Sequence, residues 1–419
     1  MKRIFIILML WAACLPLILS CNRALEVPDP EAGLPPFPKP SEQISNVPLT
    51  RAEEGFVQAG NEFAWRLTRK VWAQNTEKKS LILSPLSVQY ALGMLGNGAD
   101  ETVAKQLADV LGYEGVDAIN EFCAKLIECL PAVDTSVTLA LANGVLVKKE
   151  YTLKAPFKNA VTNYYDALVE SMSFSDPNAV MKYVNDWCYK HTYGRIKDVL
   201  KEVDPDAFMY LMNAIYFYSK WTKPFEKANT RNEDFHSLSG TAVKVGMMHQ
   251  TLDTSYGEND ACQSVSIPYG NRRFVLTVYL PKSEKGLAAL LDQPQESMAK
   301  PYEYCHVILS LPGFRTDYEI DMKNLLAGMG LPLSPYNELV EKSKGAPEIS
   351  KVIHKANITV NETGTEAAAV TVIEMRDYAS AGPMPEPRTV TFTADHPFLY
   401  TITEATSRAI LFTGVYTGN

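Results

Sequence analysis

The residue types that most often perform catalysis are present in this 419-residue sequence, but they form no recognisable catalytic motif. There is no G-x-S-x-G nucleophile motif, no H-E-x-x-H zinc motif, no phosphate-binding loop and no dinucleotide-binding glycine pattern. The six histidines are scattered, and none has the spacing of a metal-ligand pair: His191, His236, His249, His306, His354 and His396. We therefore expect no enzymatic activity, no metal and no organic cofactor.

The most unusual stretch is NETGTEAAAVTVIEMRDYASAGPMPEP, residues 361–387, which passes from turn formers through small residues to a Gly- and Pro-rich loop. If residues 365–376 form a strand, side chains alternate between its two faces. One face is small or apolar throughout: Thr365, Ala367, Ala369, Thr371, Ile373 and Met375. The other face carries all three charges: Glu366, Ala368, Val370, Val372, Glu374 and Arg376. The segment is therefore suited both to an exposed loop and to a buried strand, and an ordinary edge strand fits the alternation equally well.

Around this segment, helical patterns crowd the first half of the chain and strand patterns the second. Apolar spacing predicts helices within residues 55–73, 84–99 and 101–112, the second with a serine at its start and Pro85 just inside it. Strands are predicted within residues 138–149, 207–221, 272–281, 304–314 and 397–418. Because there is no regular β-α-β alternation, we expect an α+β fold with antiparallel or mixed sheets.

The N-terminus has the pattern of an export signal. A basic start, Lys2 and Arg3, precedes an apolar run that ends at Cys21. This arrangement resembles the bacterial lipoprotein box, which implies cleavage after residue 20 and lipidation of Cys21. An uncleaved anchor helix is the alternative. Residues 21–48 are rich in proline and predict an extended linker, so that the globular body starts near Leu49 and extends to residue 419.

Charge and cysteine content argue against a nucleic-acid-binding protein and against a disulfide framework. The formal net charge is −8 and there is no clustered basic face, so nucleic acid is not expected as a partner. After processing of the N-terminus, five cysteines remain, and no C-x-x-C pair occurs among them: Cys123, Cys129, Cys188, Cys262 and Cys305. We expect them to be buried free thiols.

Several stretches together resemble the serpin family of protease inhibitors. VNETGTEAAAVT is similar to the hinge of the serpin reactive-centre loop, E-x-G-T-E-A-A-A-x-T. The resemblance continues in order along the chain in four other segments: LILSPLSVQYALGMLGNGADETVAKQL, LMNAIYFYSKWTKPFEKANTRNEDFH, VIHKANITVNETGTEAA and ADHPFLYTITEATSRAILFTGVY. Together these segments cover the chain from about residue 50 to its end.

The resemblance implies a serpin fold, with three β-sheets, eight or nine helices and an exposed reactive-centre loop in a metastable native state. It also implies a mechanism in which a protease cleaves the loop and forms an acyl-enzyme. The loop then inserts into the central sheet and distorts the attached protease. The implied partners are chymotrypsin-like, trypsin-like, elastase-like or cathepsin-like proteases, and the implied oligomeric state is a monomer. A non-inhibitory serpin that binds a ligand or acts as a chaperone is the alternative.

Roles for individual residues follow from the same resemblance. The loop hinge comprises Glu362, Gly364, Thr365, Glu366, Ala367, Ala368, Ala369 and Thr371. Four residues match the family's shutter, a polar cluster beneath the point where the central strands part: Ser84, Ser87, Asn213 and His354. Trp221 matches the tryptophan of the breach, where the loop first inserts.

The position of the cleaved bond is open between three residues. Counting from Glu362 at the family's usual spacing places it at Tyr378-Ala379, which suits chymotrypsin-like or cathepsin-like proteases. Arg376 would suit trypsin-like proteases and Met375 elastase-like ones. Location is expected to be the periplasm or the cell envelope, at a membrane surface, with a membrane contacted only through the lipid on Cys21.

Overall fold

The computed structural model describes residues 40, 42–192, 194, 198–204, 207–283, 286–293, 298–341, 348–349, 351–364 and 386–418. Within these residues there are eight α-helices and one short 3₁₀ helix, η1 (Lys227–Asn229). The α-helices are α1 (Arg51–Gln74), α2 (Pro85–Gly96), α3 (Glu101–Leu111), α4 (Val116–Ala132), α5 (Ala155–Tyr165), α6 (Pro177–His191), α7 (Leu287–Asp292) and α8 (Lys323–Ala327). Six of them precede residue 192, so the prediction of a helix-rich first half is confirmed.

The strands follow the predicted second-half pattern closely. They are β1 (Leu81–Leu83), β2 (Thr138–Lys148), β3 (Leu168–Met172), β4 (Met209–Tyr218), β5 (Arg231–His236), β6 (Ala242–Glu258), β7 (Cys262–Tyr269), β8 (Phe274–Pro281), β9 (Glu303–Pro312), β10 (Phe314–Asp321), β11 (Ile353–Val360), β12 (Thr389–Thr393), β13 (Phe398–Glu404) and β14 (Ile410–Tyr416). Each of the five predicted strand regions overlaps at least one of these strands, but the strand patterns did not predict β1, β3, β5, β6, β7, β11 and β12.

The ends of the helices have the chemistry that their sequences suggest. Ser84 caps α2, because its Oγ accepts a hydrogen bond from the backbone N–H of Ser87 at 3.2 Å, and Pro85 opens the helix. Gly112 closes α3 with a φ of +80°, a backbone conformation that glycine adopts without strain. The helix limits predicted from sequence are therefore set by local hydrogen bonding.

The described strands form three sheets. The largest has nine strands in the order β1-β14-β13-β8-β7-β6-β9-β12, with β5 paired to β6. A three-stranded sheet has the order β3-β2-β4, and a two-stranded sheet joins β10 to β11. The β12-β9 and β2-β3 pairs are parallel and the other pairs are antiparallel, so the expected mixed α+β fold is confirmed.

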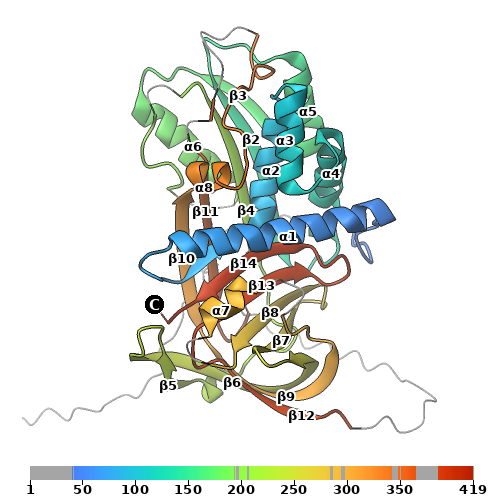
Figure 1. Ribbon diagram of the computed structural model, residues 1–419, viewed down its shortest axis with the longest axis vertical. Helices are drawn as coiled ribbons and strands as arrows, with labels where there is room; N and C mark the ends of the chain where they lie inside the picture. Colours follow the sequence, from blue (N-terminus) through green and yellow to red (C-terminus); the bar gives the residue numbers. More distant parts are fainter. Residues whose placement is uncertain are drawn as a thin grey trace, which may run out of the picture.

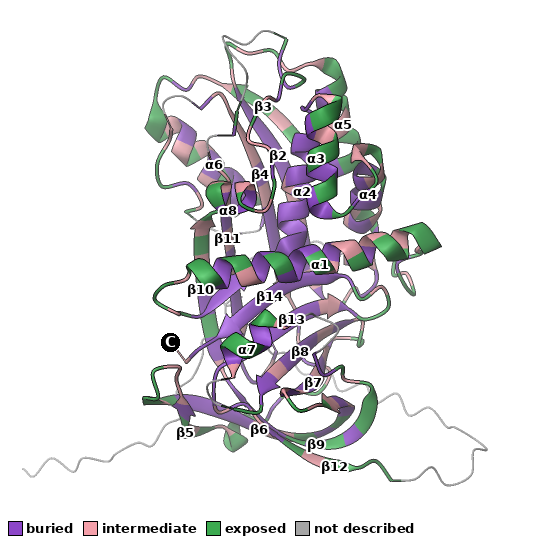
Figure 2. Cartoon of the chain, in the orientation of Figure 1, coloured by how far each residue is buried: buried purple, intermediate pink, exposed green. Residues whose placement is uncertain are grey.

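Helix α2 occupies the centre of the molecule, behind α1 and between the large sheet and the smaller ones (Figure 1). Eleven of its residues are buried, which is typical of a helix that is packed on all sides (Figure 2). In the sheet β3-β2-β4, β2 and β4 have buried side chains on both faces, whereas β3 is largely exposed. One face, with Ile215, belongs to the main core around α2, and the other, with Ala214 and Met212, packs against Trp187 of α6.

Contacts with the globular body begin slightly before Leu49. The backbone N–H of Ile44 donates to the carbonyl oxygen of Ala132 at 2.9 Å, and Val47 is buried. The five predicted free cysteines are all buried and unpaired, and burial raises the pKa of Cys188 to about 12, so this thiol is protonated and unreactive. None of the helices in the described ranges is long and apolar enough to cross a membrane.

Candidate functional site

Strands β4 and β11 lie next to each other without forming a ladder. β4 is bonded to β2 on one side, and β11 is bonded to β10 on its far side. No backbone hydrogen bond joins the described residues of β4 to those of β11. The two strands run in the same direction, since their N-terminal residues line one cavity and the chain segments after their C-terminal ends bond to each other. The edges of β4 and β11 that face each other are therefore open.

The chain segments that follow β4 and β11 are hydrogen-bonded to each other just beyond the ends of the two strands, at Trp221. The backbone N–H of Trp221 donates to the Thr363 carbonyl at 3.1 Å, and its indole Nε1 donates to the Asn361 carbonyl at 2.9 Å. The Trp221 ring stacks on Tyr269 with centroids 4.3 Å apart. The predicted breach tryptophan thus lies directly against the start of the predicted hinge.

The two described hinge residues, Glu362 and Gly364, are held on the body of the protein at this junction. The buried Glu362 accepts a hydrogen bond from Thr230 Oγ1 at 2.8 Å, and its carbonyl accepts one from the Phe225 N–H at 2.7 Å. Gly364 has a φ of +101°, and a Cβ atom there would lie 2.3 Å from the backbone nitrogen of Trp221. Only glycine fits, because both the backbone conformation and the contact exclude a side chain.

The four predicted shutter residues are brought together at the N-terminus of α2. Ser84 Oγ donates to the Leu411 carbonyl at 2.9 Å, which ties α2 to β14. Ser87 Oγ donates to Asn213 Oδ1 on β4. The backbone N–H of Ser84 donates to His354 Nε2 on β11 at 3.1 Å. Helix α2 therefore holds β4 and β11 separately, one through Asn213 and the other through His354.

Sequence reasoning missed two members of this network. Asn213 Nδ2 donates to Asn143 Oδ1 on β2 at 2.6 Å, and Asn143 Nδ2 donates to the Tyr165 carbonyl at 2.7 Å. Asn143 is a buried polar residue in an otherwise apolar strand, and this was a signal that the sequence already contained. The network thus extends from β14 through β4 and β2 to the end of α5.

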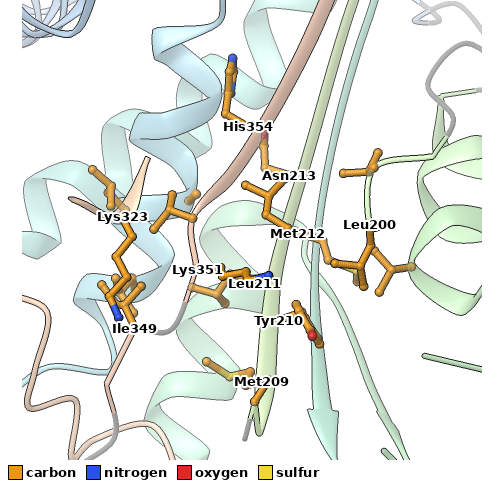
Figure 3. Close-up of a pocket in the computed structure, with 18 of the residues that line it drawn as sticks. Leu200, Met209, Tyr210, Leu211, Met212, Asn213, Lys323, Ile349, Lys351 and His354 are labelled. Atoms are coloured by element: carbon orange, nitrogen blue, oxygen red, sulfur yellow. The ribbon is translucent and has the colours of Figure 1, made fainter. Parts of the chain in front are cut away.

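A cavity of about 490 Å³ lies between the N-terminal parts of the two strands. Its walls include Met209, Leu211 and Asn213 from β4, and Ile353 and His354 from β11. Figure 3 shows the side chains around it, with His354 and Asn213 toward the same end. Glu348 and Lys351 are among the residues around it, and the cavity is partly open to solvent.

Residues 198–204, part of the connection between α6 and β4, line the cavity and contact β10 and β11 on its other side. Lys201 forms an ion pair with Glu319 of β10 at 2.9 Å, and Lys355 of β11 donates to the Asp198 carbonyl at 3.0 Å. Glu202 pairs with Lys351 at the entrance to β11. Leu200 in the same segment is buried, and its backbone C=O and N–H both bond to the Asn185 side chain of α6 at 2.8 Å, so the segment is packed on α6 as well as bridged by charges.

The remaining predicted site residues lie outside the described residues. These are Cys21, the hinge residues Thr365, Glu366, Ala367, Ala368, Ala369 and Thr371, and the candidate cleavage residues Met375, Arg376, Tyr378 and Ala379. Their assignments stay predictions. The described chain holds the start of this segment at Gly364 beside Trp221, and it resumes at the exposed Glu386, two residues before Arg388, which is paired with Glu303.

The environment of His354 makes stability depend on pH. Burial lowers the pKa of His354 to about 4, below the ordinary value of 6.5, and its Nε2 already accepts a hydrogen bond. The unfolded chain therefore binds a proton more readily than the folded one between pH 6.5 and pH 4. The stabilising contribution is complete above pH 6.5 and is lost as the pH falls, by on the order of 3 kcal/mol at pH 4.

We expect the thermal unfolding temperature to fall more steeply from pH 7 to pH 4 in the native chain than in His354→Gln. Glutamine keeps an acceptor for the Ser84 N–H but does not titrate. Calorimetry of both proteins at matched scan rates measures the difference, since other titrating groups contribute equally to both. Parallel pH profiles would show that His354 is not the group responsible.

Comparison with known proteins agrees with this arrangement. The family model described as serpin (serine protease inhibitor) matches residues 58–418. Serpin-Z10 of Arabidopsis thaliana is 32% identical over 381 residues, which are 85% of this chain and 96% of that protein. The native stressed conformation of Arabidopsis AtSerpin1 superimposes with a TM-score of 0.77 at 27% identity, covering 89% of this chain and 99% of the other.

A third similarity is to a ligand-binding protein. Human thyroxine-binding globulin in complex with its ligand superimposes with a TM-score of 0.73 at 25% identity, over 87% of this chain and 98% of the other. The family model spans most of the sequence, and three sheets and eight α-helices are present in the described residues, where three sheets and eight or nine helices were expected. The chain belongs to the serpin family.

Proposed function

We propose that this serpin inhibits endopeptidases by acting as a suicide substrate and is not itself an enzyme. The observation that supports this best is the open edge between β4 and β11, which are joined only beyond their C-terminal ends by Trp221 and Thr363. The segment proposed as the reactive-centre loop begins at residue 365, directly after this junction. A strand that enters from there, antiparallel to both neighbours, would fill the open edges.

The length of the loop suits such an insertion. β4 has 10 residues, which span ~33 Å at the rise of a strand. Ten residues counted from Thr365 end at Glu374. All three candidate cleavage residues, Met375, Arg376 and Tyr378, therefore follow the part of the loop that is needed to pair with β4.

In the proposed mechanism, the nucleophile of the protease attacks the carbonyl carbon of the bond after Tyr378. The C–N bond breaks, the new amine leaves with a proton at Ala379, and the acyl group remains on the nucleophile as an ester or thioester. Insertion of residues 365–374 then carries the attached protease from the Trp221 end toward the cavity end of β4. Inhibition requires that this movement be faster than hydrolysis of the acyl bond.

The open cavity supports the insertion step. An entering strand would meet the α2 side of the sheet with its small face, Ala367 and Ala369 among others, and would keep Glu366 on the opposite face. Asn213 and His354 bond to the same end of α2, so a strand that widens the gap would have to displace at least one of these contacts. Residues 198–204 line the lower part of the gap and would have to move as it fills.

The cleaved bond and the targets remain proposals. Tyr378-Ala379 suits chymotrypsin-like or cathepsin-like proteases, Arg376 suits trypsin-like ones and Met375 suits elastase-like ones. A non-inhibitory, ligand-binding role is the second candidate, favoured by the similarity to thyroxine-binding globulin and by the cavity between β4 and β11. Under that role the loop would be cleaved without trapping the protease.

We further propose that the protein is exported and tethered to the cell envelope by a lipid on Cys21. In a bacterial host, mass spectrometry of the N-terminal peptide is expected to show a diacylglyceryl group on Cys21 and no residues 1–20. The variant Cys21→Ser should lose the lipid and leave the membrane fraction. An unmodified Cys21 in a membrane-bound chain with residues 1–20 still attached would support the uncleaved anchor instead.

Incubation with chymotrypsin, trypsin and elastase tests the inhibitory function. We expect a covalent complex that survives a denaturing gel, together with a released C-terminal fragment. Mass spectrometry of this fragment identifies the bond: a start at Ala379 supports Tyr378, a start at Asp377 supports Arg376, and a start at Arg376 supports Met375. If every protease cleaves the loop and none is trapped, the inhibitory proposal is wrong.

A charge in the hinge tests the insertion step separately from cleavage. Ala367→Arg places a guanidinium on the face that would enter the core, where burial without a partner costs several kcal/mol. We expect the number of inhibitor molecules consumed per trapped protease to rise by about tenfold or more. Glu366→Arg is the matched control, because that face already carries a charge, and it should stay within about twofold of the native chain. Equal values for the two variants would contradict the assigned faces.

A further inference from the structure

Exposed apolar side chains are concentrated on one strand of the large sheet. Among the described residues, six large apolar or aromatic side chains are exposed. Three lie on β9 or just before it: Tyr302 (69% exposed), Tyr304 (55%) and Ile308 (45%). The other three, Tyr164, Leu168 and Tyr189, belong to α5, the start of β3 and α6, at the opposite end of the molecule (Figure 1).

The two exposed apolar side chains of β9, Tyr304 and Ile308, share one surface with the exposed His306. Tyr304, His306 and Ile308 are exposed and alternate with buried residues along β9, so they point to the same side of the sheet. We call these three residues the β9 outer face. Ile308 lies between Thr251 of β6 and Thr391 of β12. β9 is therefore paired on both sides and is not an edge strand, so its exposed apolar side chains do not serve to cover an unpaired edge.

This face lies where the chain returns from the proposed reactive-centre loop. Arg388 forms a bidentate pair with Glu303, at 3.1 Å from Nε and 2.9 Å from Nη2, and its carbonyl accepts the His306 N–H at 3.0 Å. Such paired contacts fix the position of the chain. The end of the loop is thus held beside the start of β9, with the Arg388–Glu303 pair on the opposite face of the strand from Tyr304.

Chain length limits how far a bound protease can be from this face. Ten residues, 379–388, lead from the proposed cleavage site to the anchored Arg388, and they span at most about 35 Å when fully extended. Cleavage after Arg376 or Met375 would add only two or three residues. A folded protease attached to the loop is itself tens of ångströms across, so its surface comes within reach of the β9 outer face for any of the three bonds.

We propose that Tyr302 and the β9 outer face form a second contact surface for the attacking endopeptidase, on the C-terminal side of the cleaved bond. This proposal rests on the proposed inhibitory function and adds a determinant of partner choice outside the loop. Tyrosine is enriched in protein interfaces because a rigid ring buries a large area while its hydroxyl stays hydrogen-bonded. The surface would strengthen the encounter complex and leave the insertion step unchanged.

The double variant Tyr304→Ser with Ile308→Thr tests the surface, and Tyr164→Ser with Leu168→Thr is the matched control at the other end of the molecule. The partner is the protease that cleaves the loop fastest. Two quantities are measured: the rate of covalent complex formation, and the affinity for the same protease with its nucleophile replaced by alanine. For the β9 variant we expect both to fall about tenfold, with an unchanged number of inhibitor molecules consumed per protease. For the control variant we expect no change.

The outcomes separate this surface from the inhibitory function. If the native chain forms no covalent complex, the inhibitory function fails, but the affinity for the inactive protease still reports on the surface. Affinity equal to that of the native chain would overturn the second contact surface. So would a native dimer in sedimentation that the β9 variant dissociates without loss of protease affinity, because the face would then bind another copy of the chain. The single variant Ile308→Thr repeats the test if the double variant unfolds at a lower temperature.

Discussion

Two adjacent strands that do not pair impose the constraint on which the rest of this structure depends. The facing edges of β4 and β11 leave backbone N–H and C=O groups without the ladder that a continuous sheet would give them. The strands are prevented from drifting apart by Trp221, whose backbone and indole both bond to residues 361–363. The stacked Tyr269 and the buried Glu362 hold that junction in place. An open edge next to a fixed entry point is the arrangement that a new strand requires.

The core below this gap is organised to tolerate it. Helix α2 is buried on all sides, and its N-terminus contacts β4 through Ser87 and Asn213 and β11 through the N–H of Ser84 and His354. Because both strands bond to the same end of α2, through Ser84 and Ser87, the helix sets the separation of β4 and β11, and an entering strand would have to change at least one of these contacts. A buried polar network is stabilising only when its members are all bonded, and this one continues through Asn143 to Tyr165. His354 must stay neutral for the same reason, because its Nε2 can accept the Ser84 N–H only when that nitrogen carries no proton.

Much of this arrangement could be predicted from sequence, for identifiable reasons. The limits of α2 follow from Ser84 and Pro85, and the strand β9 follows from its alternation, both of which are local signals. The grouping of Ser84, Ser87, Asn213 and His354 came from family resemblance, because contacts between positions up to 270 residues apart leave no local pattern. Thr230 and Tyr269 were missed for the same reason, whereas Asn143 was a polar residue within an apolar strand and could have been singled out. The hydrophobic periodicity also could not predict that β4 and β11 do not pair. Both have ordinary strand sequences, and only the absence of hydrogen bonds between them is unusual.

The size of the cavity bears on what would drive an insertion. A strand that enters the gap gains backbone hydrogen bonds on both sides, each worth about 1 kcal/mol net, but ordering each of its residues costs about 1–2 kcal/mol. These two contributions are of similar size and largely cancel. The cavity of about 490 Å³ adds a packing contribution, because apolar side chains that enter it bury surface against α2. Under the proposed mechanism, packing side chains into the space beside α2 therefore adds to the driving force, which explains why the entering face must be small and uncharged.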